Sequence, residues 1–195
     1  MIVLASKSAA RRAVLAGAGV PFEAVVAGVD EDAVKASLLA EGATPRDVAD
    51  ALSELKAVKV SRRGPEFVIG ADQTLELDGR LYDKVETLEA ARRRLRELRG
   101  RTHKLHSAVV VAKDGAPIWR EVASATLTMR PFSDAFLEDY LATDGEAALG
   151  SVGCYRLESL GAQLFSRIEG DYFAILGLPL LGLLELFRRH GVLPE

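Results

Sequence analysis

Acidic and basic side chains follow the ends of several predicted strands and loops, where they could act together. They are Asp30, Glu31, Lys56, Asp72 and Lys84. Carboxylates at such positions suit Mg²⁺, which binds one or two protein carboxylates and fills its other positions with water and phosphate oxygens. Lysines nearby would stabilise a departing pyrophosphate. The alternative for each residue taken alone is an ordinary solvated surface charge.

Asp72 differs from the other four because it directly follows a buried apolar run at residues 68–71. A carboxylate at the end of such a strand is poorly solvated, so it must be paired or bind a metal. Of the five residues, Asp72 therefore fits an ordinary solvated surface position least well.

A second candidate feature opens the chain, where an apolar run at residues 2–5 passes through hydroxyl side chains into a basic helix start. The first N–H groups of a helix lack partners and favour an anion. Ser8 is the expected N-cap, and Lys7, Arg11 and Arg12 supply cations of the kind that hold a polyphosphate. Positive charge there opposes the helix dipole by about 0.3–1 kcal/mol per charge, which favours a bound anion. The alternative is a surface helix with a basic first turn.

The elements that must position these residues alternate between helices and strands, which indicates an α/β or α+β domain. Strands are predicted at residues 2–5, 21–26, 67–71, 74–77, 80–82, 105–113 and 118–129, with short strands turning at Glu169-Gly170. Helices are predicted after the N-caps Ser8, Thr44, Thr87 and Ser133, and at residues 180–190. The helix after Ser133 is predicted through Tyr140, before a glycine-rich stretch at residues 145–153. Hairpin turns are predicted at Asp78-Gly79 and Asp114-Gly115.

Composition excludes several classes of protein. The 195 residues are 49% hydrophobic and 27% charged, enough for one domain or for two lobes that share a sheet. A net charge of −3 argues against a surface that binds nucleic acid polymers. The single cysteine, Cys154, fits a reducing compartment, and the longest apolar segment is interrupted by Pro179 and Glu185 before it could span a membrane. We expect a cytoplasmic protein.

The chain lacks several common motifs. It has no G-x-x-x-x-G-K-[ST], no G-x-G-x-x-G and no paired C-x-x-C, which excludes P-loop, Rossmann and paired-cysteine zinc sites. His103 and His106 lie three residues apart in one predicted strand, so they face opposite sides and cannot chelate one ion.

Short motifs nevertheless run in order along nearly the whole chain. They are Leu4-Ala5-Ser6-x-Ser8-x-x-Arg11-Arg12, Asp30-Glu31, Lys56-Ala57, Ile69-Gly70-Ala71-Asp72, Leu77-Asp78-Gly79 with Lys84, Gly100-Arg101-Thr102-His103, Arg167-Ile168-Glu169-Gly170 and Gly177-Leu178-Pro179-Leu180. Single pieces are weak, but the ordered set resembles the Maf family. That resemblance implies one domain over residues 1–195, with a two-lobed α/β fold like that of inosine triphosphatases. An elongated mixed sheet flanked by helices and a central nucleotide cleft are implied.

The resemblance also implies an activity. The family is known as cytoplasmic nucleoside triphosphate pyrophosphatases, historically named for inhibiting septum formation, which use Mg²⁺, Mn²⁺ or Co²⁺ and are commonly homodimers. The matching residues are Ser6, Ser8 and Arg11 for the phosphate-binding loop, Glu31 and Asp72 for the acidic metal pair, and Lys56 and Lys84 for phosphate contacts. Asp72 matches the proton acceptor for a water that attacks the α-phosphorus and releases pyrophosphate.

Departures from the common family pattern concern the choice of base. The dTTP and UTP branch typically has Asp-Thr and Gln, where this chain has Asp72-Gln73 and Glu158; Gln73 and Glu158 resemble the 7-methyl-GTP branch. A carboxylate at Glu158 would accept hydrogen bonds from the N1–H and N2–H₂ edge of guanine, whereas uracil and thymine offer carbonyls that it would repel. That branch often has Trp in place of Ala10. The alternative for Glu158 is a loop acid that faces solvent.

Three functional hypotheses follow. The first is a housecleaning pyrophosphatase acting on 7-methyl-GTP, and the second is a dTTP/UTP pyrophosphatase. The third is a nucleotide-binding regulator of cell division whose hydrolysis is incidental. Glu31 and Asp72, together with both lysines, favour catalysis because a protein that only binds a nucleotide needs no carboxylate positioned to activate water.

Overall fold

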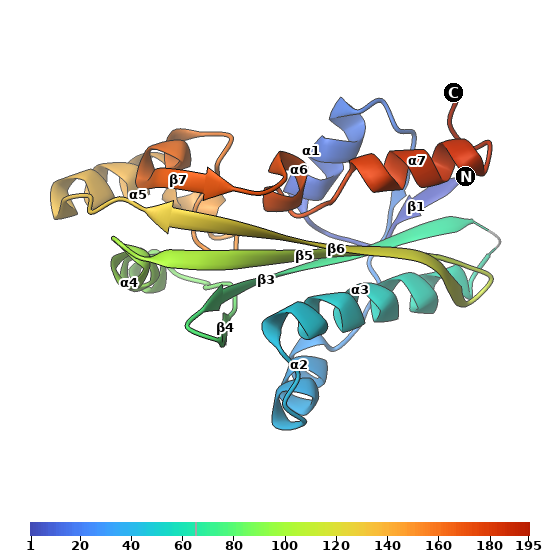
Figure 1. The fold of residues 1–195 in the computed structure, drawn as a ribbon, viewed down its shortest axis with the longest axis horizontal. Coiled ribbons are helices and arrows are strands. Elements are labelled where there is room, and N and C mark those ends of the chain that lie inside the picture. Colours follow the sequence, from blue (N-terminus) through green and yellow to red (C-terminus); the bar gives the residue numbers. More distant parts are fainter. Residues whose placement is uncertain (65) are drawn as a thin grey trace.

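The computed structural model describes residues 1–64 and 66–195, which form a seven-stranded mixed sheet with helices on both faces (Figure 1). The strands are β1 (Ile2–Leu4), β2 (Glu23–Ala24), β3 (Phe67–Leu77), β4 (Arg80–Tyr82), β5 (Thr102–Lys113), β6 (Ala116–Met129) and β7 (Phe165–Glu169). The helices are α1 (Ala9–Gly17), α2 (Glu31–Ala40), α3 (Pro45–Ser61), α4 (Leu88–Leu98), α5 (Asp134–Ala148), α6 (Tyr172–Ile175) and α7 (Leu181–Arg189), with a 3₁₀ helix η1 (Leu160–Leu164). The predicted fold class is confirmed.

The strand order is β2-β1-β3-β5-β6-β7, and β4 also pairs with β3. β1 runs parallel to β2 and β3, whereas all the other pairs are antiparallel. On one edge of β3, β1 pairs with residues 67–69 and β4 pairs with residues 75–77. Residues 70–74 therefore have no strand partner on that edge, while β5 pairs with their other edge.

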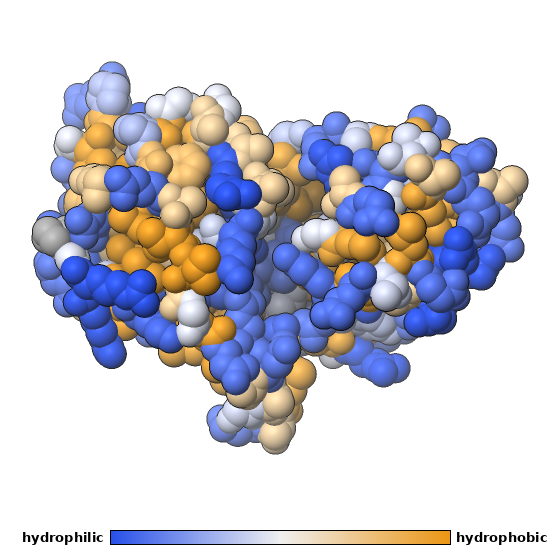
Figure 2. Space-filling view, turned by 180° about the vertical axis from the view of Figure 1, so that it is seen from behind, coloured by the Kyte–Doolittle hydropathy of each residue, from blue (hydrophilic) through white to orange (hydrophobic). Residues whose placement is uncertain are grey.

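Two hydrophobic cores occupy different ends of the same sheet. One is built where α1 and α7 pack on the sheet, around Leu15, Ile69 and Phe187. The other is built where α4 and α5 pack, around Leu95 and Tyr140. Figure 1 shows α1 and α7 on one side of the sheet and α3 with α2 on the other. Figure 2 shows the surface hollowed between the two ends, with hydrophilic residues bordering the hollow.

The four predicted N-caps and the two predicted hairpin turns are confirmed. The side chains of Ser8, Thr44, Thr87 and Ser133 each accept a hydrogen bond from a backbone N–H in the first turn of their helix. Asp78-Gly79 and Asp114-Gly115 both adopt positive φ angles, between 51° and 80°, as a tight turn between twisted antiparallel strands requires. Every helix within the described residues is too short or too polar to span a membrane.

Helix α2 is absent from the sequence prediction, which places the second helix at Thr44. Asp30 caps α2 by accepting a hydrogen bond from Ala33 N at 3.1 Å, and Glu31 and Asp32 stabilise its first turn. No residue of α2 is buried. The sequence therefore lacks the strong apolar stripe from which a helix is usually recognised.

The prediction that Asp72 follows the end of a strand is wrong. β3 continues without interruption from Phe67 to Leu77, because β5 pairs with it on both sides of Asp72. What ends near Asp72 is the pairing with β1, whose last partner on β3 is Ile69.

Other elements also differ from the prediction. β2 is reduced to Glu23–Ala24, and α5 continues through Gly145 to Ala148. A Cβ on Gly145 would lie 2.9 Å from Leu88, so this glycine lets α4 and its loop approach α5 rather than ending the helix. After Gly170 the chain forms the short helix α6 instead of a second strand.

Candidate active site

Three predicted site residues meet at one ammonium group. Lys56 Nζ lies 2.7 Å from Asp72 Oδ1 and 3.0 Å from Glu31 Oε1. Lys56 is 5% exposed and Asp72 is 7% exposed, so this contact lies largely out of water. The buried carboxylate is paired, as the sequence analysis requires for Asp72.

Close packing of α3 on β3 brings Lys56 over Asp72. A Cβ at Gly70 would lie 2.1 Å from the Ser53 carbonyl oxygen and 2.6 Å from Ala57 N. Only a glycine leaves room for the helix backbone at this distance from the strand. Gly70 and Asp72 face the same side of β3 because side chains alternate along a strand.

Arg11 connects α1 to the unpaired edge of β3. Its Nη1 donates to Ala71 O at 2.9 Å and to Ser6 Oγ at 3.2 Å, and its Nε donates to Gly177 O at 2.8 Å. Its Nη2 has no hydrogen-bond partner among residues 1–64 and 66–195. Burial lowers the pKa of Arg11, while the charges of Asp72 and Glu31 oppose that effect. The guanidinium stays protonated.

Ser6 and Ser8 shape the turn before α1. Ser8 N donates to Ser6 Oγ at 3.2 Å, and Arg11 N donates to Ser8 Oγ at 3.4 Å. Both hydroxyl oxygens therefore orient the first turn of α1, whose remaining N–H groups point away from the helix body.

Lys84 completes the set of charges. Its side chain is solvent-exposed, yet partial loss of water around its ammonium lowers its pKa, and the positive charge of Arg11 lowers it further. Asp72 and Glu31 act in the opposite direction. The charge of Lys56 also lowers the pKa of Lys84, so four charged residues of this region act on its ammonium group, which lies within electrostatic range of them. Three cations and two carboxylates thus share one region.

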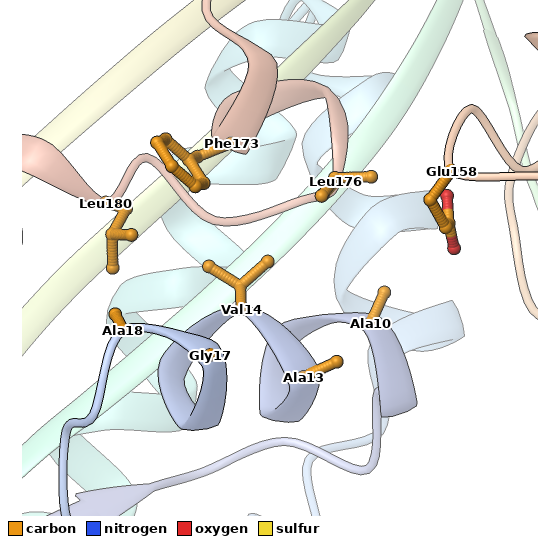
Figure 3. A pocket seen from close by; sticks show the side chains of 9 residues that line it. All are labelled: Ala10, Ala13, Val14, Gly17, Ala18, Glu158, Phe173, Leu176 and Leu180. Carbon is orange, nitrogen blue, oxygen red and sulfur yellow. The ribbon is translucent and has the colours of Figure 1, made fainter.

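An apolar cavity of about 380 Å³ lies against α1 (Figure 3). It is lined by Ala10, Ala13, Val14, Gly17, Ala18, Glu158, Phe173, Leu176 and Leu180. Figure 3 shows Glu158 near Ala10 and Leu176, at one end of the row of apolar side chains. Ala10 precedes Arg11 on α1, so the cavity adjoins the charged cluster.

The structure thus brings Ala10 and Glu158 together on this cavity, although they are 148 positions apart in the sequence. Glu158 Oε1 accepts a hydrogen bond from Arg156 Nε at 3.3 Å. The Glu158 side chain is 33% exposed. It is therefore a loop acid that borders an apolar cavity.

Gln73 lies behind the cavity, not among the residues that line it. Its Nε2 is 2.8 Å from Ser107 Oγ, 3.1 Å from Ala174 O and 3.0 Å from Ile175 O. These contacts hold α6, the short helix that supplies Phe173 to the cavity. Gln73 is thus placed to position the cavity wall.

The donor set suits a hard divalent cation. Glu31 and Asp72 place two carboxylates on one point, which is as many protein carboxylates as Mg²⁺ usually takes when phosphate and water fill its other positions. Across the described residues, no group of three or more His, Cys, Asp or Glu side chains gathers as a complete protein-only metal site.

The sequence did not identify two residues that contact the neighbours of predicted site residues. Asp144 contacts Arg156 beside Glu158, and Lys35 contacts Asp83 next to Lys84. No local pattern identifies such partners, because their role depends on the packing of distant segments. The apolar spacing after Gly170 could have indicated α6, but it is only four residues long.

Comparison with known proteins shows the family of the chain. A family model described as Maf-like protein matches residues 1–190. A protein of Caulobacter vibrioides named nucleoside triphosphate pyrophosphatase is 67% identical over 192 residues, which cover 98% of this chain and 96% of that protein. A Brucella abortus protein named 7-methyl-GTP pyrophosphatase is 50% identical over 190 residues, which cover 97% of this chain and 96% of that protein. The chain therefore belongs to the Maf family.

Proposed function

We propose that this protein hydrolyses nucleoside triphosphates to a nucleoside monophosphate and pyrophosphate, with 7-methyl-GTP as its preferred substrate. The observation that carries this proposal is the contact of buried Lys56 with Asp72 and Glu31, next to an apolar cavity that ends at Glu158. The names of the relatives support the reaction, and the name of the Brucella abortus relative supports the base.

The nucleotide would lie in the hollow between two lobes of a single domain over residues 1–195. Its phosphates would meet the N–H groups at the start of α1, the hydroxyls of Ser6 and Ser8, and the free Nη2 of Arg11. Its base would enter the cavity beside Ala10 and Glu158. Gln73 would contribute by holding α6 in place.

Glu31 and Asp72 would hold a divalent cation such as Mg²⁺, Mn²⁺ or Co²⁺. When bound, such an ion neutralises phosphate charge and acidifies a coordinated water. Both residues offer oxygen donors at one place, and Lys56 keeps them oriented there in the structure.

The chain's own residues divide the reaction between proton transfer and charge stabilisation. Lys56 occupies Oδ1 of Asp72, which leaves Oδ2 free to orient a water and accept its proton during attack on the α-phosphorus. Lys56, Lys84 and Arg11 Nη2 would stabilise the negative charge on the departing pyrophosphate. Burial of Asp72 and Lys56 strengthens these charge interactions, because water screens them less.

Base choice would depend on the single charged side chain in the cavity. Glu158 would accept hydrogen bonds from the N1–H and N2–H₂ edge of a guanine and would repel the carbonyls of uracil or thymine. Ala10 leaves the neighbouring face of the cavity open to a substituted purine. Phe173 supplies an aromatic ring for contact with a cationic base.

Pyrophosphate release from 7-methyl-GTP, GTP, dTTP and UTP in the presence of Mg²⁺ tests the proposal. We expect 7-methyl-GTP to have the highest kcat/KM. Asp72→Asn should reduce turnover by about 10²–10⁴-fold while calorimetry shows that nucleotide binding is retained. Asp114→Asn, in a distant hairpin turn where asparagine is favoured, is the matched control.

The outcomes separate the alternatives. Faster turnover of dTTP or UTP would refute the proposed base, and nucleotide binding without any turnover would favour a regulator of cell division. We further propose a cytoplasmic homodimer, which light scattering and cell fractionation can test.

A further inference from the structure

Asp144 fixes the turn that carries Glu158, although the proposed reaction makes no use of it. It lies on α5 and is 9% exposed. Its Oδ1 is 3.0 Å from Arg156 Nη1, and its Oδ2 accepts a hydrogen bond from the Ser159 hydroxyl. The Arg156 carbonyl closes the same turn by accepting from Ser159 N at 3.3 Å. One buried carboxylate therefore holds both residues that flank Leu157-Glu158.

Arg156 is shared between two carboxylates. Its guanidinium is 3.0 Å from Asp144 and 3.3 Å from Glu158. The Asp144 side chain is 10% exposed, whereas that of Glu158 is 33% exposed, so water screens the Asp144 contact less. The three formal charges sum to −1, so Arg156 cannot neutralise both carboxylates, and its less screened contact with Asp144 leaves Glu158 only partly neutralised.

This remaining charge faces an otherwise apolar space. Among the residues that line the cavity within the described chain, Glu158 alone is charged. Apolar walls weaken dielectric screening, so a positively charged ring inside the cavity would be attracted strongly to Glu158. A delocalised cation is also weakly hydrated, and it loses less on leaving water than a compact ammonium does.

We propose that Asp144 and Arg156 are specificity-determining residues that set the preference of the cavity for a cationic purine base. They do so by controlling how much of the Glu158 charge faces the ligand. This inference rests on the proposed function only in taking the cavity to be the base site. Asp144 acts through Arg156 and is a positioning residue that need not touch the ligand.

Calorimetric affinities for 7-methyl-GMP and GMP test the inference without requiring turnover. The two ligands differ by the N7 methyl group and the positive charge it creates. We expect wild type to favour 7-methyl-GMP, and Asp144→Asn to reduce that preference about threefold to fivefold, because Arg156 then neutralises Glu158. Arg156→Gln should raise the preference, because the Glu158 charge then has no guanidinium partner. The double variant should resemble Arg156→Gln, because Asp144 has no guanidinium left to hold.

Asp139→Asn is the matched control, since it removes the same charge from an exposed position on α5. It should leave the preference unchanged. Equal affinity of wild type for both ligands, or a ratio that neither variant changes, would overturn the inference. If Asp144→Asn fails to fold, Arg156→Gln decides alone, because an unchanged or lowered preference in that variant contradicts the proposal.

Pyrophosphate release by the same preparations separates this inference from the proposed function. No hydrolysis of any nucleotide refutes the function whatever the affinities show. Hydrolysis with a base preference independent of Asp144 and Arg156 refutes only the inference.

Discussion

Asp72 and Glu31 approach the same ammonium group from two very different parts of the molecule. Asp72 lies on β3, which pairs with β5 and is covered by α3, and its side chain is 11% exposed. Glu31 begins α2, which has no buried residue, and its side chain is 42% exposed. The hydrophobic core fixes one carboxylate, whereas charge fixes the other.

Ion pairs attach α2 to both of its neighbours. Glu31 contacts Lys56 on α3, and Lys35 contacts Asp83 at 2.6 Å, beside Lys84. Each pair has one solvent-exposed carboxylate. Pairs near the surface stabilise by about 0–1 kcal/mol each, so α2 should open more readily than the core. The side of the site that carries Asp72 is therefore rigid, whereas the side that carries Glu31 is free to adjust to a ligand.

The largest effect should come from removing the shared cation. Lys56→Met leaves two carboxylates facing each other, and we expect turnover to fall by about 10²–10³-fold. The free energy of unfolding should fall by about 3 kcal/mol, because buried Asp72 loses its partner. Pyrophosphate release and urea denaturation measure these changes. Lys104→Met, at an exposed position on β5, is the control, and equal losses in both variants would contradict the assignment.

The rigid side can be disturbed without touching a charge. Gly70→Ala places a Cβ against α3, and we expect the free energy of unfolding to fall by about 2–3 kcal/mol, as in other overpacked cores. Urea denaturation measures it. Gly17→Ala, which meets no atom within 4 Å, should instead be neutral or stabilise by up to about 1 kcal/mol. If the two variants unfold alike, the tight contact between α3 and β3 does not exist.

The pH dependence of activity tests whether Lys84 belongs to the site. Because the pKa of Lys84 is lowered, its ammonium is lost as pH rises through a value below that of free lysine. We expect kcat/KM to fall on the alkaline side below pH about 10.4. Lys84→Arg should flatten this limb, since a guanidinium stays charged there. If kcat/KM of the variant falls at the same alkaline pH as in wild type, the titrating group is not Lys84.

The smallest effect on stability should come from a substitution in α2. Lys35→Met should lower the free energy of unfolding by less than about 1 kcal/mol, yet hydrogen exchange in α2 should accelerate while that in α3 stays unchanged. Mass spectrometry of exchanged peptides separates the two helices. Equal protection of α2 and α3 in wild type would remove the distinction between a fixed and an adjustable side.

Local signals predicted much of the fold. The turns at Asp78-Gly79 and Asp114-Gly115 and the cap at Ser8 depend on neighbouring residues, and all three are confirmed. Helix α2 was missed because ion pairs with distant residues hold it, and sequence periodicity does not report them. Asp72 was misplaced within its element because an apolar run does not show where a strand's neighbour stops.

The candidate site was only partly accessible from sequence for a related reason. Residue types and order identified Lys56, Asp72 and Arg11, which the structure brings into one region. The sequence did not show that the Gln73 side-chain amide donates to a carbonyl of α6 or that Asp144 accepts a hydrogen bond from Arg156. Both facts depend on side chains that meet only after the helices have packed.

The gap along β3 has a consequence for how such a site can be gained or lost. After Ala5, whose N–H donates to Ile69 O, the chain bends away, and Arg11 takes the place of a strand at Ala71 O. If β1 paired with β3 for two more residues, its backbone would fill that opening and leave no room for a ligand. In the proposed function, the shortness of β1 therefore decides whether this edge only supports the sheet or can also hold a substrate, even if every reactive side chain were kept.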